Sequence, residues 1–375
     1  MKIRVAITGL QRGDNPQPGA AIVRSLRRTL EVEIVGLVYD AYESGIYVEG
    51  GVDSAHVMPY PTCGAAAWLG RLDEVRAHSP FEVLMPTLDS EIDLLAGAPE
   101  EFARRGIRCP LPAPEALARR DKKNLALLGE ECGVPVPEQI VVRDLRGALA
   151  AARRIGWPVF IKGQYYDARL ADGADSLTEE ASAILANWGP PLIVQQPVAG
   201  PEFDVLGVGD GRGGTLGMCA IRKTHLSNKG KGIGAVTVRD PRLEEASRRV
   251  VEALAWHGPF ELEWILGPDG YTLIEMNPRF PAWVDFPSQL GANFATAWME
   301  ELLGNRPAPL PVLPPGRFFL RHQIEVVGEI GRLASLLAET GDLLASGYEI
   351  RPYPTLASAP GLLAGLDSHR PTPTP

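Results

Sequence analysis

The stretch LIEMNPRFPAWVDFP, residues 273–287, begins as an apolar β-strand and then presents a group of polar side chains. Glu275 and Asn277 stand two positions apart, so the alternation of a strand places both on one face. Pro278 ends the strand and Arg279 follows it. A carboxylate, an amide and a guanidinium are thereby brought together at one point of the chain.

This strand has a partner directly before it in the sequence. FELEWIL and YTLIEMN (residues 260–277) flank the turn sequence GPDG, which is typical of a β-hairpin. A loop of three residues would pair Glu263 with Glu275 and Glu261 with Asn277. A loop of two or four residues would shift the pairing by one and separate these side chains.

The first of these registers predicts a metal site. Carboxylates that oppose each other directly destabilise a sheet unless a cation lies between them. Clustered carboxylate and amide oxygens suit Mg²⁺, which takes one or two carboxylates together with substrate phosphates. The alternative is the solvated polar face of an amphipathic hairpin. Arg279 favours the metal site, because a guanidinium beside it would hold a phosphate or a carboxylate.

The composition is that of an ordinary globular protein. The chain has 375 residues, 45% hydrophobic and 22% charged, so it should hold two or three domains. The net charge of −9, without a basic run, argues against a nucleic-acid partner. The four cysteines are widely spaced, and neither a signal-like N-terminus nor a membrane-length apolar run is found. These features predict a reduced, cytoplasmic protein outside membranes.

Residues 1–112 alternate buried strands with helical segments. The runs expected as parallel strands are RVAIT, EIVGLVYD and FEVLMPT. AAIVRSLRRTL between the first two has helical spacing, so the chain opens with a βαβ unit. The loop GLQRGDNPQPG, residues 9–19, lacks the GxGxxG pattern, so dinucleotide binding is not favoured. The alternative for this loop is a turn that lines a substrate cleft.

Two further lobes and a C-terminal region are expected. Residues 113–188 are predicted as a small α+β lobe with helices over 121–132, 145–155 and 179–187 and the strand WPVFIK. Residues 189–305 are predicted as an antiparallel sheet backed by helices, with the strands PLIVQQP, EFDVLGVGD, GTLGMCAIRK, GAVTVRD, FELEWIL and YTLIEMN. The Pro-rich NRPAPLPVLPPG opens a linker and C-terminal region over 306–375, with a disordered tail.

Two lysines stand where a charge needs a reason. Lys162 ends the buried strand WPVFIK, and Lys122 lies on the first turn of the helix after Asp121, where it opposes the helix dipole. Both positions suit an anionic ligand. As alternatives, Lys162 reaches water from a strand end, and Lys122 forms a surface pair with Lys123.

The segment LIVQQPVAGPEF adds a third element. A strand that runs into Pro197 leaves the backbone groups around Gln196 and Val198 without sheet partners, free to bond the edge of an adenine ring. Glu202 follows at a distance suited to ribose hydroxyls. The alternative is an ordinary strand end followed by a turn.

In this order, the motifs DK, PVFIK, VQQPVAGPE, FELEWIL and LIEMNPR resemble those of the ATP-grasp superfamily, in particular its carbamoyl-phosphate-synthase and biotin-carboxylase-like branch. The resemblance covers residues 1–305. It implies a fold of α/β and α+β parts, in which a Rossmann-like domain precedes a two-lobed ATP-grasp domain.

The resemblance also implies roles for single residues. The family's nucleotide contacts correspond to the phosphate-binding Lys122 and Lys162, the adenine-binding Gln195, Gln196 and Val198, and the ribose-binding Glu202. Its magnesium ligands correspond to Glu263, Glu275 and Asn277, and its catalytic groups to Lys162 and Arg279, of which the arginine contacts phosphate or the activated acyl group. Glu261 has no counterpart and is expected to be structural.

The implied activity is the ATP-dependent ligation of a carboxylate to an amine, on an amino acid or a peptide, through an acyl phosphate. ATP and Mg²⁺, or Mn²⁺, would be the cofactors, and a homodimer is compatible with the resemblance. One alternative is a carbamoyl-phosphate or carboxylase-type enzyme that uses bicarbonate. Another is a nucleotide-binding regulator without turnover.

The sequence departs from the family after the strand lysine. Family members usually continue with a glycine-rich lid over the phosphates, whereas GQYYDARLADGADSL follows Lys162 here. We expect a short hairpin whose Gln164, Tyr165 and Tyr166 shield the phosphates instead. The glycine-rich THLSNKGKGIGAVTV is the other candidate, with charges from Arg222, Lys223, Lys229 and Lys231. The alternative for these basic residues is a solvated loop.

Overall fold

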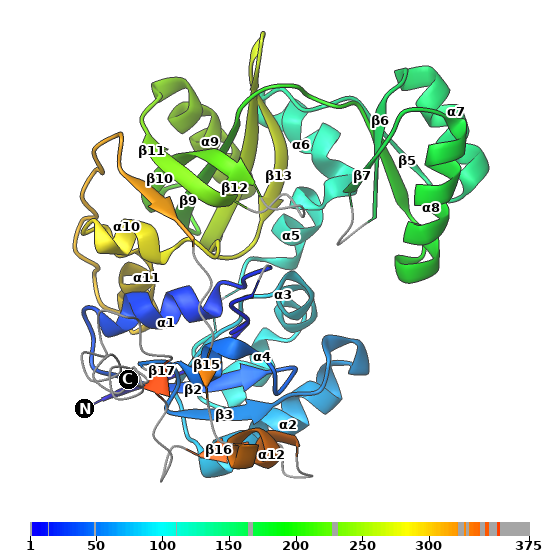
Figure 1. Ribbon diagram of the computed structural model, residues 1–375. Coiled ribbons are helices and arrows are strands. Elements are labelled where there is room, and N and C mark those ends of the chain that lie inside the picture. Colours follow the sequence, from blue (N-terminus) through cyan, green and yellow to red (C-terminus); the bar gives the residue numbers. More distant parts are fainter. Residues whose placement is uncertain are drawn as a thin grey trace, which may run out of the picture.

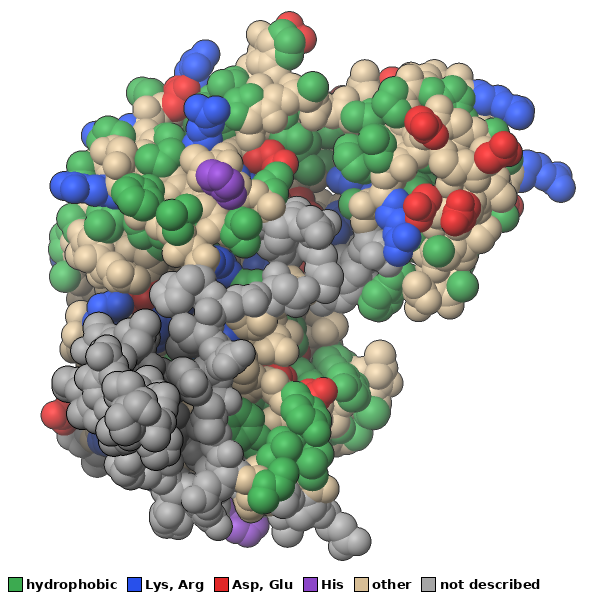
Figure 2. Space-filling model, in the orientation of Figure 1, with side chains coloured by type: hydrophobic (Ala, Val, Ile, Leu, Met, Phe, Trp, Pro, Cys, Tyr) green, Lys and Arg blue, Asp and Glu red, His purple; other side chains and the backbone are tan. Residues whose placement is uncertain are grey.

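The computed structural model describes residues 2–13, 15–48, 50–109, 111–163, 168–226, 232–321, 326–327, 330–337, 342–344 and 351–352. It has a mixed α/β fold with parallel and antiparallel sheets, as the sequence predicts. Figure 1 shows an N-terminal domain at the bottom, a large lobe above it and a small lobe at the upper right. The surface is hollowed between the small lobe and the N-terminal domain (Figure 2).

The N-terminal domain is built on a five-stranded sheet in the order β16-β3-β2-β1-β4. Its strands are β1 (Ile3–Thr8), β2 (Val32–Val38), β3 (Ser54–Val57), β4 (Val83–Met85) and the antiparallel edge strand β16 (Asp342–Leu344). Its helices are α1 (Gly19–Arg27), α2 (Ala65–His78), α3 (Asp89–Ala96) and α4 (Pro99–Arg104). Val5 and Ile7 face one hydrophobic core and Ala6 faces another. Burial on both faces explains why these strands read as continuous apolar runs.

The small lobe is a four-stranded antiparallel sheet in the order β5-β8-β6-β7, covered by two helices. Its elements are β5 (Gln139–Val142), α7 (Leu145–Ile155), β6 (Val159–Lys162), β7 (Ala168–Ala171), α8 (Ala174–Trp188) and β8 (Leu192–Gln195). Helix α7 begins at Asp144, whose carboxylate accepts the N–H of Gly147 at 2.7 Å, an N-cap. Val159 and Leu177 belong to a core confined to this lobe.

The segment before the small lobe packs elsewhere. Helix α5 (Pro114–Arg120), the turn η3 (Lys122–Asn124) and helix α6 (Leu125–Cys132) lead toward β5. Leu117 and Leu128 join the core of the large lobe, although the sequence division placed residues 113–188 in one unit. The helix expected over 121–132 begins only at Leu125, and Asp121 instead caps the turn η3 by accepting the N–H of Lys123 at 3.2 Å.

The large lobe contains the expected antiparallel sheet, in the order β13-β12-β9-β10-β11-β14. Its strands are β9 (Glu202–Asp210), β10 (Thr215–Leu226), β11 (Gly232–Val238), β12 (His257–Gly267), β13 (Gly270–Asn277) and β14 (Phe318–Leu320). Its helices are α9 (Pro241–Leu254), α10 (Asp285–Gln289) and α11 (Phe294–Leu302). Strand β14 comes from beyond the Pro-rich segment and pairs with β11.

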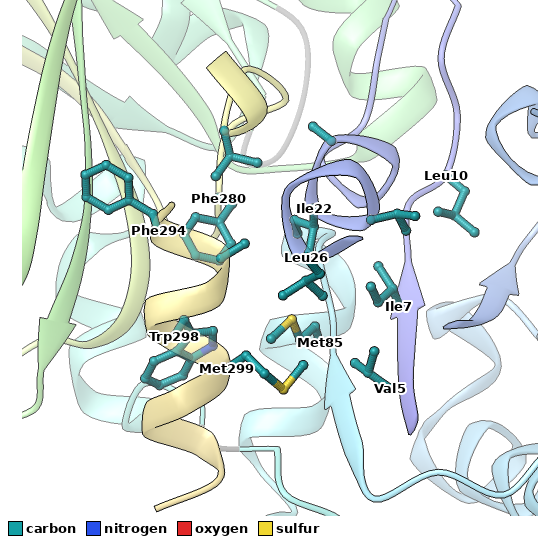
Figure 3. Close-up of a cluster of buried hydrophobic side chains, with 14 of the residues drawn as sticks. Val5, Ile7, Leu10, Ile22, Leu26, Met85, Phe280, Phe294, Trp298 and Met299 are labelled. Atoms are coloured by element: carbon teal, nitrogen blue, oxygen red, sulfur yellow. The ribbon is translucent and has the colours of Figure 1, made fainter. Parts of the chain in front are cut away.

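One hydrophobic core joins the large lobe to the N-terminal domain. Figure 3 shows side chains of α1, among them Leu26, facing Trp298 and Met299 of α11. A polar contact reinforces this junction, because Asp285 lies 3.2 Å from the Nε of Arg24. The two parts therefore form one continuous body.

The remaining elements are short. They are the turns η1 (Ser44–Tyr47) and η2 (Pro61–Cys63), strands β15 (Val326–Val327) and β17 (Arg351–Pro352), and helix α12 (Ile330–Leu337). In the part of the chain that the structure describes, no helix has the length and apolar character needed to cross a membrane.

Candidate functional site

The hairpin of β12 and β13 has the predicted pairing of side chains, but its turn is shorter than expected and its register shifts within the strands. The turn has two residues, since Gly267 pairs with Gly270, and this departs from the three-residue loop expected. The register then shifts between Trp264 and Glu263, so that Glu263 lies opposite Glu275 after all. A β-bulge absorbs one extra residue on β13 and restores the face of the side chains beyond it.

Asn277 links the carboxylates of this face. Its Nδ2 donates to Glu261 Oε2 and to Glu263 Oε1, each at 3.1 Å. Because both acceptors are carboxylates, the amide group must present Nδ2 to them. Among the described residues no donor to Asn277 Oδ1 is found, which leaves this oxygen able to accept from, or coordinate, a further group.

Arg279 connects the hairpin to the N-terminal domain. Its Nε donates to Asp89 at 3.0 Å, and its Nη1 donates to Glu261 at 3.3 Å. Glu261 also accepts the indole N–H of Trp283 at 3.0 Å. Although burial opposes its charge, Asp89 and Glu261 raise the pKa of Arg279 above its ordinary value. The buried Glu261 therefore positions Arg279 and Asn277, in keeping with its expected structural role.

Lys122 reaches the same face from the turn η3. Its Nζ lies 3.1 Å from Glu275 Oε1. Burial disfavours its charge, but Glu275 outweighs burial and raises the pKa of Lys122. Lys122 is thus an ion-pair partner inside the site rather than half of a surface lysine pair.

Lys162, at the end of β6, has a lowered pKa, whereas that of Lys122 is raised. Burial, only partly offset by Glu275, lowers the pKa of Lys162 to about 8. Its Nζ lies 5.9 Å from the centre of the Phe160 ring, and no ion pair to it is found within the described residues. A lysine that is buried without a counter-ion suits an anion that arrives from outside.

A buried pair that the sequence did not assign to the site lies beside Glu263. Lys223 on β10 contacts Glu263 Oε2 at 3.1 Å, Asp204 at 3.0 Å and Glu202 at 3.3 Å. Burial raises the pKa of Asp204, although Lys223 opposes this effect. Burial alone would lower the pKa of Lys223, but Glu263 and its other acidic neighbours outweigh burial and raise it. The available signal was Asp204 itself, a carboxylate in an otherwise buried strand.

The donor set fits a hard cation that also binds phosphate oxygens. Glu263, Glu275 and Asn277 supply two carboxylates and an amide oxygen, whereas Mg²⁺ needs only one or two protein carboxylates beside phosphates and water. No group of three or more acidic, histidine or cysteine ligands is close enough to hold a metal alone among the described residues. In the structure, Lys122 neutralises the charge of Glu275 and Lys223 neutralises that of Glu263.

A cavity of about 250 Å³ borders this face on the side of the N-terminal domain. Its charged lining includes Asp89 and Asp93 of α3, Arg120, Lys122 and Glu275. Space therefore adjoins the ion pair of Lys122 and Glu275, at the junction of the large lobe and the N-terminal domain.

Comparison with known proteins shows which solved structures share this fold. No family model matches the sequence. An L-amino acid ligase from Bacillus licheniformis superposes with a TM-score of 0.63 at 16% identity, over 98% of this chain and 97% of that one. The biotin carboxylase domain of Hydrogenobacter thermophilus 2-oxoglutarate carboxylase, solved with MgADP and bicarbonate, gives 0.60 at 18% identity, over 82% and 70%. An ADP complex of N5-carboxyaminoimidazole ribonucleotide synthetase gives 0.62 at 12% identity, over 84% and 80%.

The chain has the ATP-grasp fold. Lys162 ends β6 of the small lobe, whereas Glu275 lies on β13 of the large lobe.

The segment expected to bind adenine differs from the prediction at one backbone group. Gln195 is buried, and its Nε2 donates to Gln139 at 3.0 Å. The backbone N–H of Gln196 donates to the carbonyl of Glu138 at 2.8 Å, so it is not the unpaired donor that was expected. The hydrogen bonding between β8 and the chain ahead of β5 continues one residue past the end of β8, and this bond uses the N–H of Gln196. Val198 lies beyond that bond, and Glu202 contacts Lys223.

Several predictions about the lid cannot be placed. Gln164, Tyr165 and Tyr166 lie outside the described residues, as do Lys229 and Lys231. Of the other two basic residues, Arg222 is exposed and Lys223 is buried in the site. The interpretation of this segment as a solvated basic loop therefore fails for Lys223.

Proposed function

We propose that this protein is an ATP-dependent carboxylate–amine ligase. The observation that carries the proposal is the pairing of Glu263 with Glu275 beside Asn277. Lys122 contacts Glu275, and Arg279 contacts the neighbouring Glu261. Each group suits phosphoryl transfer to a carboxylate, in which catalysis consists of positioning and neutralising charge.

The reaction proceeds in two steps. An oxygen of the substrate carboxylate attacks the γ-phosphorus of ATP, and ADP leaves. The amine nitrogen then attacks the carbonyl carbon of the acyl phosphate, the C–O bond to phosphate breaks, and phosphate leaves with one amine proton. When bound, Mg²⁺ would neutralise the charge that develops on the phosphates.

The residues of this chain divide the remaining work. Glu263, Glu275 and Asn277 would hold the cation, and Lys122 and Lys162 would contact the phosphates. Arg279 is held by Asp89 and Glu261, so it would present a fixed guanidinium to the phosphate or the acyl group.

The remaining residues would have the roles that the ATP-grasp resemblance implies. Gln195, Gln196 and Val198 would bind adenine, for Gln196 through its carbonyl, since its N–H is in use. Glu202 would bind the ribose after releasing Lys223. The N-terminal domain, residues 1–112, would be the Rossmann-like domain of the family, because its strands β1–β4 pair in parallel and its opening βαβ unit is present. We also propose a cytoplasmic location, Mg²⁺ or Mn²⁺ as the metal, and a homodimer.

Coverage favours the ligase over the bicarbonate-using alternative. The L-amino acid ligase matches nearly the whole length of both chains, whereas the biotin carboxylase domain leaves parts of both unmatched. We therefore propose amino acids or peptides as substrates.

Turnover with a substrate panel tests this function. ADP release would be measured with ATP, Mg²⁺ and pairs of L-amino acids, and the products would be identified by mass spectrometry. ADP release that requires both an acid and an amine, with an amide product of matching mass, supports the ligase. ADP release with bicarbonate alone would support a carboxylase, and tight ATP binding without any release would support a regulator.

A further inference from the structure

Three carboxylates stand in one row across the sheet of the large lobe. Glu275 on β13 lies opposite Glu263 on β12, and Glu263 lies opposite Asp204 on β9. Residues directly opposite each other on neighbouring strands have their side chains close together on one face. The row therefore contains two gaps between like charges, and each gap destabilises the sheet unless a cation enters it.

A lysine of the chain fills the gap between Glu263 and Asp204. The Nζ of Lys223, on β10, lies 3.1 Å from Glu263 Oε2 and 3.0 Å from Asp204 Oδ1. It also donates to Glu202 Oε2 at 3.3 Å. An ammonium group has three N–H donors, and three carboxylates surround this one. Lys223 therefore has the position and the ligands of a bound cation.

The two gaps differ in their access to water. The side chains of Asp204 and Lys223 are 4% and 5% exposed, whereas those of Glu263 and Glu275 are 26% and 23% exposed. Mg²⁺ loses its water reluctantly and usually keeps several water ligands in a protein. The closed gap therefore suits an ammonium group that is satisfied by carboxylates alone, and the more open gap between Glu263 and Glu275 suits the metal.

Lys223 also fixes the carboxylate that both gaps share. One oxygen of Glu263 accepts from Lys223, and the other accepts from Asn277, each at 3.1 Å. A carboxylate that is bonded at both oxygens has little freedom to rotate. Glu263 is therefore oriented before any metal arrives, as partners of metal ligands commonly ensure.

We propose that Lys223 is a permanent cation of the phosphoryl-transfer site, which orients Glu263 and confines the divalent metal to the gap between Glu263 and Glu275. The row of carboxylates then holds one metal ion and not two. Lys223 is a positioning residue, since it acts through Glu263. This inference rests on the proposed function, in which Glu263 and Glu275 bind the metal.

Metal counting tests the proposal without turnover. Wild type with ADP would be titrated with Mn²⁺, and the free Mn²⁺ would be measured by electron paramagnetic resonance. We expect one tightly bound Mn²⁺ per chain. Two tightly bound ions in wild type would overturn the proposal, whether or not any variant folds.

Lys223→Met opens the second gap. The variant lacks the ammonium charge, so Glu202, Asp204 and Glu263 are left without their cation. We expect it to bind one Mn²⁺ more than wild type, and Lys223→Arg, which keeps the charge, to bind the same number as wild type. Adding Asp204→Asn to Lys223→Met should remove the additional ion. An unchanged count in Lys223→Met would overturn the proposal.

Arg222→Met is the matched control. Arg222 precedes Lys223 on β10, but it is exposed and lies opposite Phe203, whose side chain belongs to the core on the other face. Its substitution changes the net charge by the same amount and should leave the Mn²⁺ count unchanged. An additional ion in this variant as well would show that net charge alone sets the count, which would overturn the proposal.

The dependence of turnover on Mg²⁺ separates this inference from the proposed function. At limiting Mg²⁺, Lys223→Met should release ADP roughly 10- to 100-fold more slowly than wild type, because Glu263 has lost a partner that orients it. The rate should recover at high Mg²⁺, where a second ion takes the place of the ammonium group. A loss that high Mg²⁺ does not relieve would overturn the proposal. If wild type shows no turnover, the ligase proposal fails, but the Mn²⁺ counts still decide the role of Lys223.

Discussion

The two lobes that flank the candidate site are attached in different ways. The large lobe shares a hydrophobic core with the N-terminal domain through α1 and α11. The small lobe has a core of its own, and one of its links to the preceding segment is the 2.8 Å bond from Gln139 to the carbonyl of Lys122. Separate cores permit separate motion. The carboxylates proposed to bind the metal and Arg279 therefore belong to the part built on the shared core, while Lys162 belongs to a lobe with a core of its own.

Breaking the shared core is expected to have the largest effect. Leu26 is fully buried in it, and Leu177 is fully buried in the core of the small lobe. Leu26→Ala should lower the free energy of unfolding of the body by about 2–5 kcal/mol. Leu177→Ala removes the same atoms but should destabilise the small lobe alone.

Hydrogen exchange distinguishes the two variants. In Leu177→Ala, amides of β6 and α8 should exchange faster while those of β9 and β12 keep their protection. Loss of protection in both lobes together would show that the small lobe is not an independent unit.

Removing a carboxylate charge from the large lobe should lower turnover and leave thermal stability almost unchanged. Glu275→Gln is expected to lower turnover at least about 100-fold, because the cation loses a ligand where charge develops. Glutamine still accepts a hydrogen bond from Lys122, so Tm should change little. Asp269→Asn, in the exposed turn of the same hairpin, is the control and should behave as wild type. An unchanged rate at limiting Mg²⁺ would remove Glu275 from the site.

Lys162 tests the contribution of the small lobe. Lys162→Met should weaken ATP binding by roughly 10- to 100-fold, the loss of a charge-assisted contact. Wild-type affinity should also fall as pH rises above about 8, where the unliganded Lys162 loses its proton. Calorimetric titration with ATP between pH 7 and 9 measures both effects. Equal affinities for variant and wild type would mean that Lys162 does not contact the phosphates.

The same lysine should affect stability with the opposite sign. Its pKa is about 8 when folded, against 10.5 for an ordinary lysine. Between these values the unfolded chain binds more protons, so stability of the small lobe should rise with pH. Below pH 8 the buried charge is fully destabilising. Lys162→Met should therefore stabilise the small lobe at pH 7 and abolish the rise, as followed by thermal unfolding.

The smallest effect is expected from the polar contact at the shared core. Asp285→Asn should lower the free energy of unfolding by about 1–2 kcal/mol, because two arginines lose a partly buried acceptor. Asp73→Asn, which breaks an exposed pair with Arg105, should cost about 0.5 kcal/mol or less. Burial raises the pKa of Asp285, but Arg28 and Arg24 outweigh it and keep the pKa below 3.8. The stability difference between wild type and Asp285→Asn should therefore be present at neutral pH. It should disappear as pH falls below the lowered pKa of Asp285, as denaturant titrations would show.

Local patterns in the sequence predicted the elements well. The bounds 145–155 of α7 and 202–210 of β9 agree with the expected ones, because a capping Asp144 and a glycine turn mark the ends. The hairpin pairing of Glu263 with Glu275 was also predicted. These features depend on residues close together in the chain.

Features that depend on distant contacts were missed. The ion pair of Asp204 with Lys223 requires knowledge that β9 and β10 are neighbours with that register. Asp89 reaches Arg279 from another domain, 190 positions away. The bond from Gln196 to Glu138 forms because β8 lies beside β5, which no feature of the VQQP motif indicates.

The β-bulge of the hairpin has a further consequence, which concerns parity. Eleven residues separate Glu263 from Glu275. A regular ladder closed by a two-residue turn can contain only an even number, so the odd residue must be placed either in the loop or in a bulge. The hairpin uses a bulge at Ile274, one residue from the site. A one-residue insertion at the turn could be placed in a three-residue loop with the bulge kept, whereas a one-residue deletion would keep Glu263 opposite Glu275 only if the bulge were lost. The bulge therefore allows a two-residue turn to be combined with an odd number of residues between the two glutamates.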